Sequence, residues 1–532
     1  MTRHGTDRTV ELVERSLDPE TATVFEDRLD EQAAWLREAI EEGTMDNADF
    51  AVGLEMEIYA VESGDASSPA DHAAGTDGAA VPRLARLPEG VFETPAANKE
   101  LGRHNVEINT EPTVLGEDGL AAQAEGIRER TRSARAAARD HGRELVLDAM
   151  WTLPPEEGTR PYLSSTAERD GVVLAENMRQ DPRYVAIDNH VLEYTDGGRI
   201  PLSVPGVDTT FPTILFESLA TSIQPHLQIP SADSFPAYYN AAIRTLGPVL
   251  ALSANAPFLP AELYDGVDDP EALVEATPHE LRIDVFEQSV NRTPNAKVRV
   301  PHDIETATDV VDRVLGDDRY APFLREWIDS ETDRESLSER VWEFDHKRGT
   351  YWRWLRCVIG GDRVDAANDE RSLRIEYRPI PTQPTVTDVV GMQALVAGLI
   401  RGLCEADHPI TTLPWAAAES SFYDAVEEGL DADLEWVTAE GEHTTDRAII
   451  FGEVFSHARE GLRTAGVPSD AVDRYLSPIE GRWTARTTPS AWKKARVREA
   501  LAEGADLADA IATMQREYVR RSLDGDAFVS WL

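Results

Sequence analysis

Polar side chains occupy every second position in four separate segments of the chain, with apolar residues between them. Side chains two positions apart in a β-strand share one face, so this spacing predicts four strands with one polar face each. The segments are residues 53–57, 104–111, 224–228 and 374–378. If the four strands lie in one sheet, one face of that sheet gathers carboxylates, an imidazole and guanidinium groups. Such a face suits divalent metal ions and phosphate groups rather than a hydrophobic core.

The first segment makes the strongest case, because Glu55 and Glu57 alternate with the apolar residues Leu54 and Ile58. A buried strand with two like charges on one face needs a cation to neutralise them. The alternative interpretation is a solvated acidic face, which a lone pair of carboxylates in an acidic protein would favour.

The other three segments carry weaker signals when each is taken alone. Glu100 precedes Glu107 by seven residues, so the second segment adds two candidate carboxylates. In the third segment, His226 lies between Gln224 and Gln228, and a lone histidine is more often a structural residue than a ligand. In the fourth segment, alternating charges often form salt bridges within a sheet. These charged residues are Arg374, Glu376 and Arg378.

The charge of the chain is strongly negative, with 97 acidic and 52 basic residues and a formal net charge of −45. Five of the basic residues are lysines, and the acidic residues are spread along the whole chain. This pattern predicts a protein from a salt-loving organism, because molar salt shortens the Debye length to about 3 Å and screens the self-repulsion. The same balance argues against a nucleic-acid partner, which would require a basic face.

The remaining composition predicts a soluble cytoplasmic protein. The two cysteines, Cys357 and Cys404, share no metal-binding or redox spacing and are predicted to be buried free thiols. We find no signal-peptide pattern and no uninterrupted apolar run of about 18 residues, so no membrane partner is expected. The oligomeric state stays open, a homo-oligomer included.

Strands and helices do not alternate regularly along the 532 residues, which favours an α+β fold over a doubly wound one. We expect a mainly antiparallel, curved sheet with helices packed outside it. Residues 1–45 are predicted to form an N-terminal helical extension, residues 46–440 the catalytic domain, and residues 441–532 a C-terminal helical segment.

Five motifs taken in order resemble the glutamate–cysteine ligase type 2 and carboxylate–amine ligase family, which is built on a glutamine-synthetase-like sheet. The matching segments are Gly-x-Glu-x-Glu at 53–57, Glu and then Glu-Ile-x-Thr at 100 and 107–110, part of His-x-His at 224–226, Ala-Leu-Ser-Ala at 251–254, and Glu-x-Arg at 376–378. The resemblance covers the chain from about residue 50 to about residue 430.

The resemblance implies ATP-dependent formation of an amide bond, such as a γ-glutamyl bond, through an acyl phosphate that an amine attacks. It implies about two or three Mg²⁺ ions held by carboxylate oxygens. The implied metal ligands are Glu55, Glu57, Glu107 and Glu376. The resemblance also implies that His226 and Arg374 contact the nucleotide and that Glu100 and Gln224 bind small-molecule substrates. Arg378 and Arg282 would neutralise phosphate charge during transfer.

The chain departs from the family pattern at two places that bear on function. Gln224 stands where the first histidine of His-x-His is expected, and the segment from Ser421 to Leu430 lacks the family's asparagine and basic residues. Two other functions therefore stay open. One is a non-catalytic or regulatory relative of the ligases, and the other is a phosphotransferase of the guanidino-kinase type on the same sheet. The sequence does not select the carboxylate or the amine.

Overall fold

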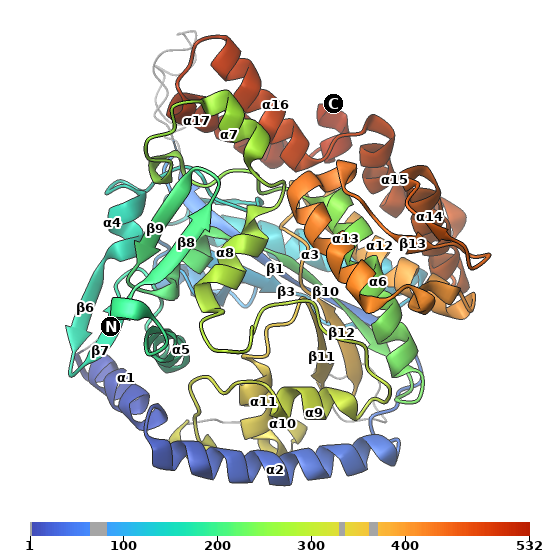
Figure 1. Cartoon of the computed structure of the whole chain (residues 1–532), viewed down its shortest axis with the longest axis horizontal. Coiled ribbons are helices and arrows are strands. Elements are labelled where there is room, and N and C mark those ends of the chain that lie inside the picture. The colour runs from blue at the N-terminus through green and yellow to red at the C-terminus, as the bar shows by residue number, and fades with distance from the viewer. Residues whose placement is uncertain (1–2, 64–81, 329–335, 361–370) are drawn as a thin grey trace.

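An antiparallel sheet forms the centre of the computed structural model, which describes residues 3–63, 82–328, 336–360 and 371–532 (Figure 1). The strands are β1 (Ala51–Glu62), β2 (Asn98–Lys99), β3 (Asn105–Asn109), β4 (Thr113–Val114), β5 (Arg143–Val146), β10 (Ile223–Ile229), β11 (Leu355–Ile359) and β12 (Leu373–Tyr377). Their order is β11-β12-β10-β1-β3-β2, and β4 and β5 also pair with β1. All of these pairs are antiparallel. The predicted α+β fold with a curved antiparallel sheet is confirmed.

Two long helices, α3 (Glu117–Arg139) and α12 (Val386–Glu405), pack on one side of this sheet. The apolar residues of β1 that alternate with its carboxylates are almost fully buried, as expected for the covered face. These residues are Leu54, Met56 and Ile58. Gln393 of α12 fastens the layers, because its side-chain amide donates to the Gly53 carbonyl at 3.0 Å and to Gln123 of α3 at 3.1 Å. The polar face of the sheet therefore lies on the opposite side.

Among the described helices, α12 alone is long and apolar enough to cross a membrane, with a mean hydropathy of 1.4 over its most apolar stretch. That stretch is 83% buried inside the protein, in contact with α6 (Phe235–Ser253), α14 (Arg447–Thr464) and α15 (Ser469–Ala485). Thr385 caps the start of α12 by accepting a hydrogen bond from the Asp388 amide. The helix thus packs as a core helix.

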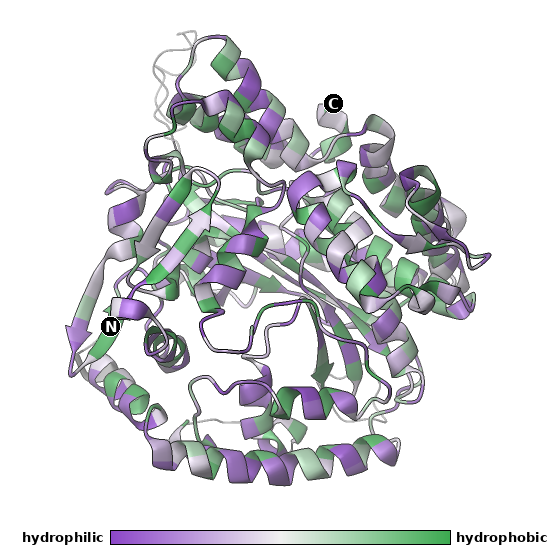
Figure 2. Cartoon of the chain, viewed as in Figure 1, coloured by the Kyte–Doolittle hydropathy of each residue, from purple (hydrophilic) through white to green (hydrophobic). Residues whose placement is uncertain are grey.

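Helices on the polar side of the sheet leave room for a cavity. They include α5 (Pro182–Leu192), α8 (Leu281–Val290) and α11 (Trp342–Arg348). The N-terminal helices α1 (Arg3–Ser16) and α2 (Pro19–Glu41) pack outside this layer, α1 on α5 and α2 on α11. Figure 2 shows hydrophilic and hydrophobic residues alternating along α2, which exposes one face to solvent.

The C-terminal helices are joined to the core by buried polar contacts. They are α14, α15, α16 (Pro489–Ala502) and α17 (Leu507–Asp524). Arg482 and Asp388 form a fully buried ion pair at 2.9 Å between α15 and α12. Gln515 of α17 donates to Asp148 at 2.6 Å and to Tyr59 of β1 at 2.9 Å. Four of the described helices lie in this segment, while the predicted division of the chain into domains stays a prediction.

The remaining regular elements surround this framework. The further helices are α4 (Thr159–Ser164), α7 (Pro270–Ala276), α9 (Asp309–Leu315), α10 (Leu337–Arg340) and α13 (Trp415–Glu428). Three two-stranded hairpins pair β6 (Thr166–Arg169) with β7 (Val172–Ala175), β8 (Ile200–Val204) with β9 (Val207–Phe211), and β13 (Trp436–Val437) with β14 (His443–Thr444).

Candidate active site

The four predicted polar strands are neighbours in the sheet, and their register brings the polar residues together. Glu57 of β1 is paired with Glu107 of β3, and Glu55 of β1 is paired with Gln224 of β10. His226 of β10 is paired with Glu376 of β12. Residues paired across antiparallel strands point to the same side of the sheet, so these side chains share one face, as the period of two predicts.

This face forms the floor of a cavity of about 390 Å³. Nine of the ten residues that the resemblance implicates line it: Glu55, Glu57, Glu100, Glu107, Gln224, His226, Arg374, Glu376 and Arg378. Residues from α5, α8 and α11 close the other sides, among them Tyr184, Phe286 and Arg348. The structure thus gathers the predicted residues from sequence positions more than 300 residues apart.

Glu57, Glu100 and Glu107 form a carboxylate cluster whose oxygen atoms lie within 4.8 Å of one another. Burial raises the pKa of all three, and repulsion between them adds to the increase for Glu100 and Glu107. The pKa of Glu100 rises to about 7, and that of Glu107 lies well above its ordinary value. Mutual repulsion in a buried site favours either protonation or a bound cation. Oxygen donors at this spacing fit Mg²⁺.

Hydrogen bonds fix the position of Glu57 within this cluster. One of its carboxylate oxygens accepts from the Ser222 amide at 2.8 Å, and the other accepts from the Gln224 side chain at 3.3 Å. Gln224 also accepts from Arg378 at 2.6 Å. Gln224 therefore links the carboxylate cluster to the guanidinium group of Arg378.

A second cluster is formed by Glu55, His226 and Glu376, again with donor atoms within 4.8 Å of one another. His226 Nε2 lies 3.4 Å from Glu55, close enough for an ion pair but without the geometry of a hydrogen bond. Burial acts to raise the pKa of Glu55, but the neighbouring His226 outweighs it and lowers the pKa below its ordinary value.

Glu376 is held by two arginines. Arg356 of β11 donates to both of its oxygens at 2.8 Å, and Arg378 forms a short ion pair with one of them. Burial would raise the pKa of Glu376, but these two charges outweigh it and hold the pKa well below its usual range. Glu376 therefore orients two guanidinium groups, and any metal ion would share this carboxylate with them.

Arg282 lies outside the cavity lining. It is 3% exposed, approaches Glu280 at 3.3 Å, and donates a short hydrogen bond to the Pro379 carbonyl just beyond β12. In this position Arg282 fastens α8 to the segment after β12, and its charge reaches the cavity through the field that it exerts on Glu57.

Sequence reasoning missed several residues that line the cavity. Arg356 completes the guanidinium cluster, and its position between the apolar residues Leu355 and Cys357 is the strand signal that could have found it. Glu217 comes from the 3₁₀-helix Ile214–Leu219, and burial raises its pKa well above the ordinary value. Tyr184 of α5 is also there, with a pKa raised chiefly by Glu100. No short-range pattern connects Glu217 or Tyr184 to the sheet.

Together, the fold and the cavity define a class of protein. It is an α+β protein whose antiparallel sheet carries clustered carboxylates beside guanidinium groups. Sites that bind polyanions together with metal ions have this combination of groups. The chain belongs to glutamate–cysteine ligase family 2, whose family model matches residues 51–524. It is accordingly a carboxylate–amine ligase by family. The match includes the C-terminal helices, which the motif resemblance did not reach.

Three solved structures are similar to this chain at low sequence identity. The glutamate–cysteine ligase of Francisella tularensis, in complex with AMP, is 12% identical and has a TM-score of 0.48, with 90% of each chain covered. A bifunctional glutathione synthetase from Pasteurella multocida is 14% identical with a TM-score of 0.47, covering 92% of this chain and 55% of that one. The ligase PafA, in complex with the ubiquitin-like protein Pup, is 10% identical with a TM-score of 0.35, covering 89% and 72%. No curated protein sequence gives a significant match.

Proposed function

We propose that the protein uses ATP and Mg²⁺ to join a small-molecule carboxylate to an amine through an acyl phosphate, with a γ-glutamyl amide as one such product. The observation that carries the proposal is the distribution of charge in the cavity. Three mutually repelling carboxylates lie on β1, β3 and the segment before β3, and a guanidinium cluster lies on β11 and β12. A phosphate donor and a carboxylate repel each other, so a site that joins them must supply both cations and arginines.

The carboxylate cluster is the first candidate for holding metal ions. Glu57, Glu100 and Glu107 offer several oxygens with raised pKa values, and a divalent cation would relieve their repulsion. Glu55, His226 and Glu376 offer a second, mixed set of donors. Bound Mg²⁺ would supply charge neutralisation for the phosphate groups.

The guanidinium cluster is the candidate for phosphate recognition. Arg356 and Arg378 are both hydrogen-bonded to Glu376, which fixes their planes before any ligand enters. Arg374 lines the same cavity. It lies two residues before Glu376 on β12, so the two side chains share one face of the sheet. Preorganised donors of this kind stabilise charge as it develops on a transferred phosphoryl group without further rearrangement.

The positions of the two departures from the family pattern argue against a non-catalytic relative of the ligases. Ser421 is buried in α13, where its hydroxyl accepts from the Glu435 amide at 2.9 Å, and it does not line the cavity. Gln224 does line the cavity, but it keeps polar contacts with Glu57 and Arg378. Neither departure removes a carboxylate or a guanidinium group from the site. The cytoplasmic location and the adaptation to molar salt stay predictions from composition.

The test is release of inorganic phosphate from ATP by the purified protein in molar KCl with Mg²⁺, against a panel of amino acids and simple amines. A ligase releases phosphate at a high rate when a carboxylate and an amine are both present, and product analysis then shows the amide. Transfer of phosphate to a single substrate, with no amide, would favour the phosphotransferase. No turnover with any pair would favour the non-catalytic relative.

A further inference from the structure

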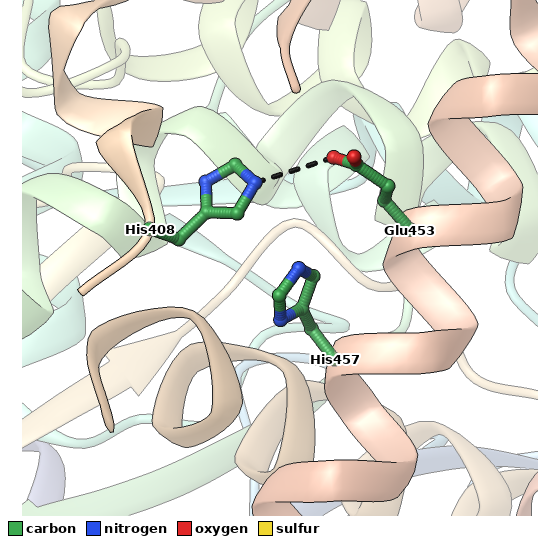
Figure 3. Close-up of side chains that lie close together, drawn as sticks. All are labelled: His408, Glu453 and His457. Carbon is green, nitrogen blue, oxygen red and sulfur yellow. Dashed lines mark hydrogen bonds and ion pairs between the residues drawn. The ribbon is translucent and has the colours of Figure 1, made fainter. Parts of the chain in front are cut away.

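A third group of metal-ligating side chains lies in the C-terminal part of the fold, away from the two clusters in the cavity. His408 follows α12, while Glu453 and His457 are four residues apart on α14 and so share one face of that helix. Figure 3 shows the three side chains converging on one space between the loop and the helix. None of the three lines the sheet cavity.

The distances within this group fit a single ion. His408 Nε2 lies 3.2 Å from a Glu453 oxygen, and one ligand atom from each of the three residues lies within 4.8 Å of the others. Two ligands about 2.0 Å from a tetrahedral ion lie about 3.3 Å apart. The His408–Glu453 pair already has this separation. The half-buried His457 has a ligand atom within 4.8 Å of both partners and would have to come closer on binding an ion.

The surrounding structure holds the ligands in place. The indole of Trp436 donates to the same Glu453 oxygen at 2.8 Å, and the Ala439 amide donates to the other at 3.0 Å. The His408 side chain is 1% exposed, and its Nδ1 atom is buried with no hydrogen-bond partner among the described residues. Supporting hydrogen bonds of this kind orient ligating carboxylates in metal sites.

Close packing of two helices sets the distance between the loop and α14. Gly402 of α12 lies against the His457 backbone, where an added Cβ atom would come within 1.9 Å of the His457 carbonyl oxygen. His408 follows only six residues after Gly402. The backbone positions of His408 and His457 are therefore fixed relative to each other by the α12–α14 contact.

We propose that His408, Glu453 and His457 bind a divalent transition-metal ion of the Zn²⁺ type, which ties the loop after α12 to α14. Two imidazoles and one carboxylate form a donor set that suits Zn²⁺, whereas Mg²⁺ prefers oxygen ligands alone. Three protein ligands leave a fourth position for water. The ion would clamp the C-terminal helices to the core and has no part in the ligase reaction.

The test is Zn²⁺ binding by the full chain in the presence of excess Mg²⁺, which occupies the carboxylate clusters. Equilibrium dialysis gives the bound Zn²⁺ per chain, and the thermal midpoint with and without Zn²⁺ gives the stabilisation. We expect His457→Gln to weaken binding at least about tenfold, the lower end of the effect of losing even a supporting partner of a metal site. The same variant loses the Zn²⁺-dependent rise in thermal midpoint.

His443→Gln is the matched control, because His443 also pairs with a glutamate, Glu435 at 2.7 Å, but is exposed and belongs to no group of three donors among the described residues. It should bind Zn²⁺ like the wild type. A second variant, His457→Cys, keeps a zinc ligand and should restore binding, which separates loss of a ligand from loss of structure. Wild-type protein that binds no Zn²⁺ under these conditions, or equal binding by His457→Gln and wild type, would overturn the proposal.

Discussion

Glu57 and Glu107 face each other directly across β1 and β3, so two partly buried carboxylates are cross-strand neighbours in the centre of the sheet. Like charges placed opposite each other destabilise a sheet. Burial raises the pKa of Glu107 well above its ordinary value, and repulsion by Glu100, Glu55 and Glu57 adds to the increase. A fold that keeps such a pair must gain something from it. The relationship is the physical basis for assigning a cation to this site.

The variant Glu107→Gln should lower Mg²⁺-dependent phosphate release by about a hundredfold or more, in line with the loss of one charge-stabilising group. Without divalent ions its free energy of unfolding should equal or exceed that of the wild type by about 0.2–1 kcal/mol, because the amide resembles the neutral acid and removes a repulsive pair. Phosphate release and chemical denaturation measure the two effects. Glu111→Gln is the matched control, since Glu111 follows the same strand but is exposed and paired with Arg130. Clear destabilisation by Glu107→Gln would contradict the metal assignment.

The variant Glu376→Gln should have the opposite effect on stability. Its carboxylate neutralises Arg356 and Arg378, and removing one partner of a buried ion pair costs about 3–5 kcal/mol. Denaturant unfolding without divalent ions measures this loss, and Glu107→Gln analysed in parallel supplies the contrast. If both variants shift stability in the same direction, the division of the cavity into a cation-binding cluster and an arginine-binding carboxylate is wrong.

Stability without divalent ions should depend on pH through Glu100. Its folded-state pKa of about 7 exceeds the ordinary value of 4.5, so the folded protein retains a proton that the unfolded chain has released. This stabilising contribution of Glu100 is fully present below about pH 4.5 and is lost as the pH rises to about 7. It amounts to at most about 3.5 kcal/mol, at about 1.4 kcal/mol per pKa unit. Unfolding in EDTA from pH 5 to 8 measures it. If the free energy of unfolding of Glu100→Gln falls with pH as steeply as that of the wild type, Glu100 is not the source of the pH dependence.

Salt should stabilise the protein strongly. The net charge of −45 is spread over the chain. The Debye length falls from about 10 Å in 0.1 M salt to about 3 Å in 1 M salt, so molar salt screens the repulsion between these charges. We expect the thermal midpoint to fall as KCl is lowered from molar to about 0.1 M. Sucrose added at low salt is the control, because it stabilises folded proteins by exclusion from their surface without screening charge. It should restore little of the lost thermal midpoint. An unchanged midpoint across this range would refute the prediction.

The sheet and most of its site could be predicted because the signal is local. Alternation with a period of two placed Glu55 and Glu57 on one face, and pairing with β10 and β12 then brought His226 and Glu376 beside them. The resemblance also implied Arg282, but this residue lies near the start of α8 and outside the cavity lining, where it contacts Glu280 and the Pro379 carbonyl.

Contributions from irregular segments could not be predicted. Residues 213–229 have strand-like composition throughout, yet the first part folds as the 3₁₀-helix Ile214–Leu219 and delivers Glu217 to the cavity. The apolar pattern of residues 302–316 also predicts a helix over that whole range, yet α9 begins only at Asp309. Tertiary packing determines the conformation of both segments, and the periodicity of the sequence does not predict it.

Transfer of oxygen from the carboxylate substrate to phosphate tests the central claim most directly. The carboxylate identified by the substrate panel is labelled with ¹⁸O and incubated with the amine, ATP and Mg²⁺, and the inorganic phosphate is analysed by mass spectrometry. Attack of the amine on an acyl phosphate leaves the bridging oxygen on the phosphate, so the account predicts one ¹⁸O atom in phosphate for each amide formed. Amide that accumulates while the phosphate carries no label would contradict it.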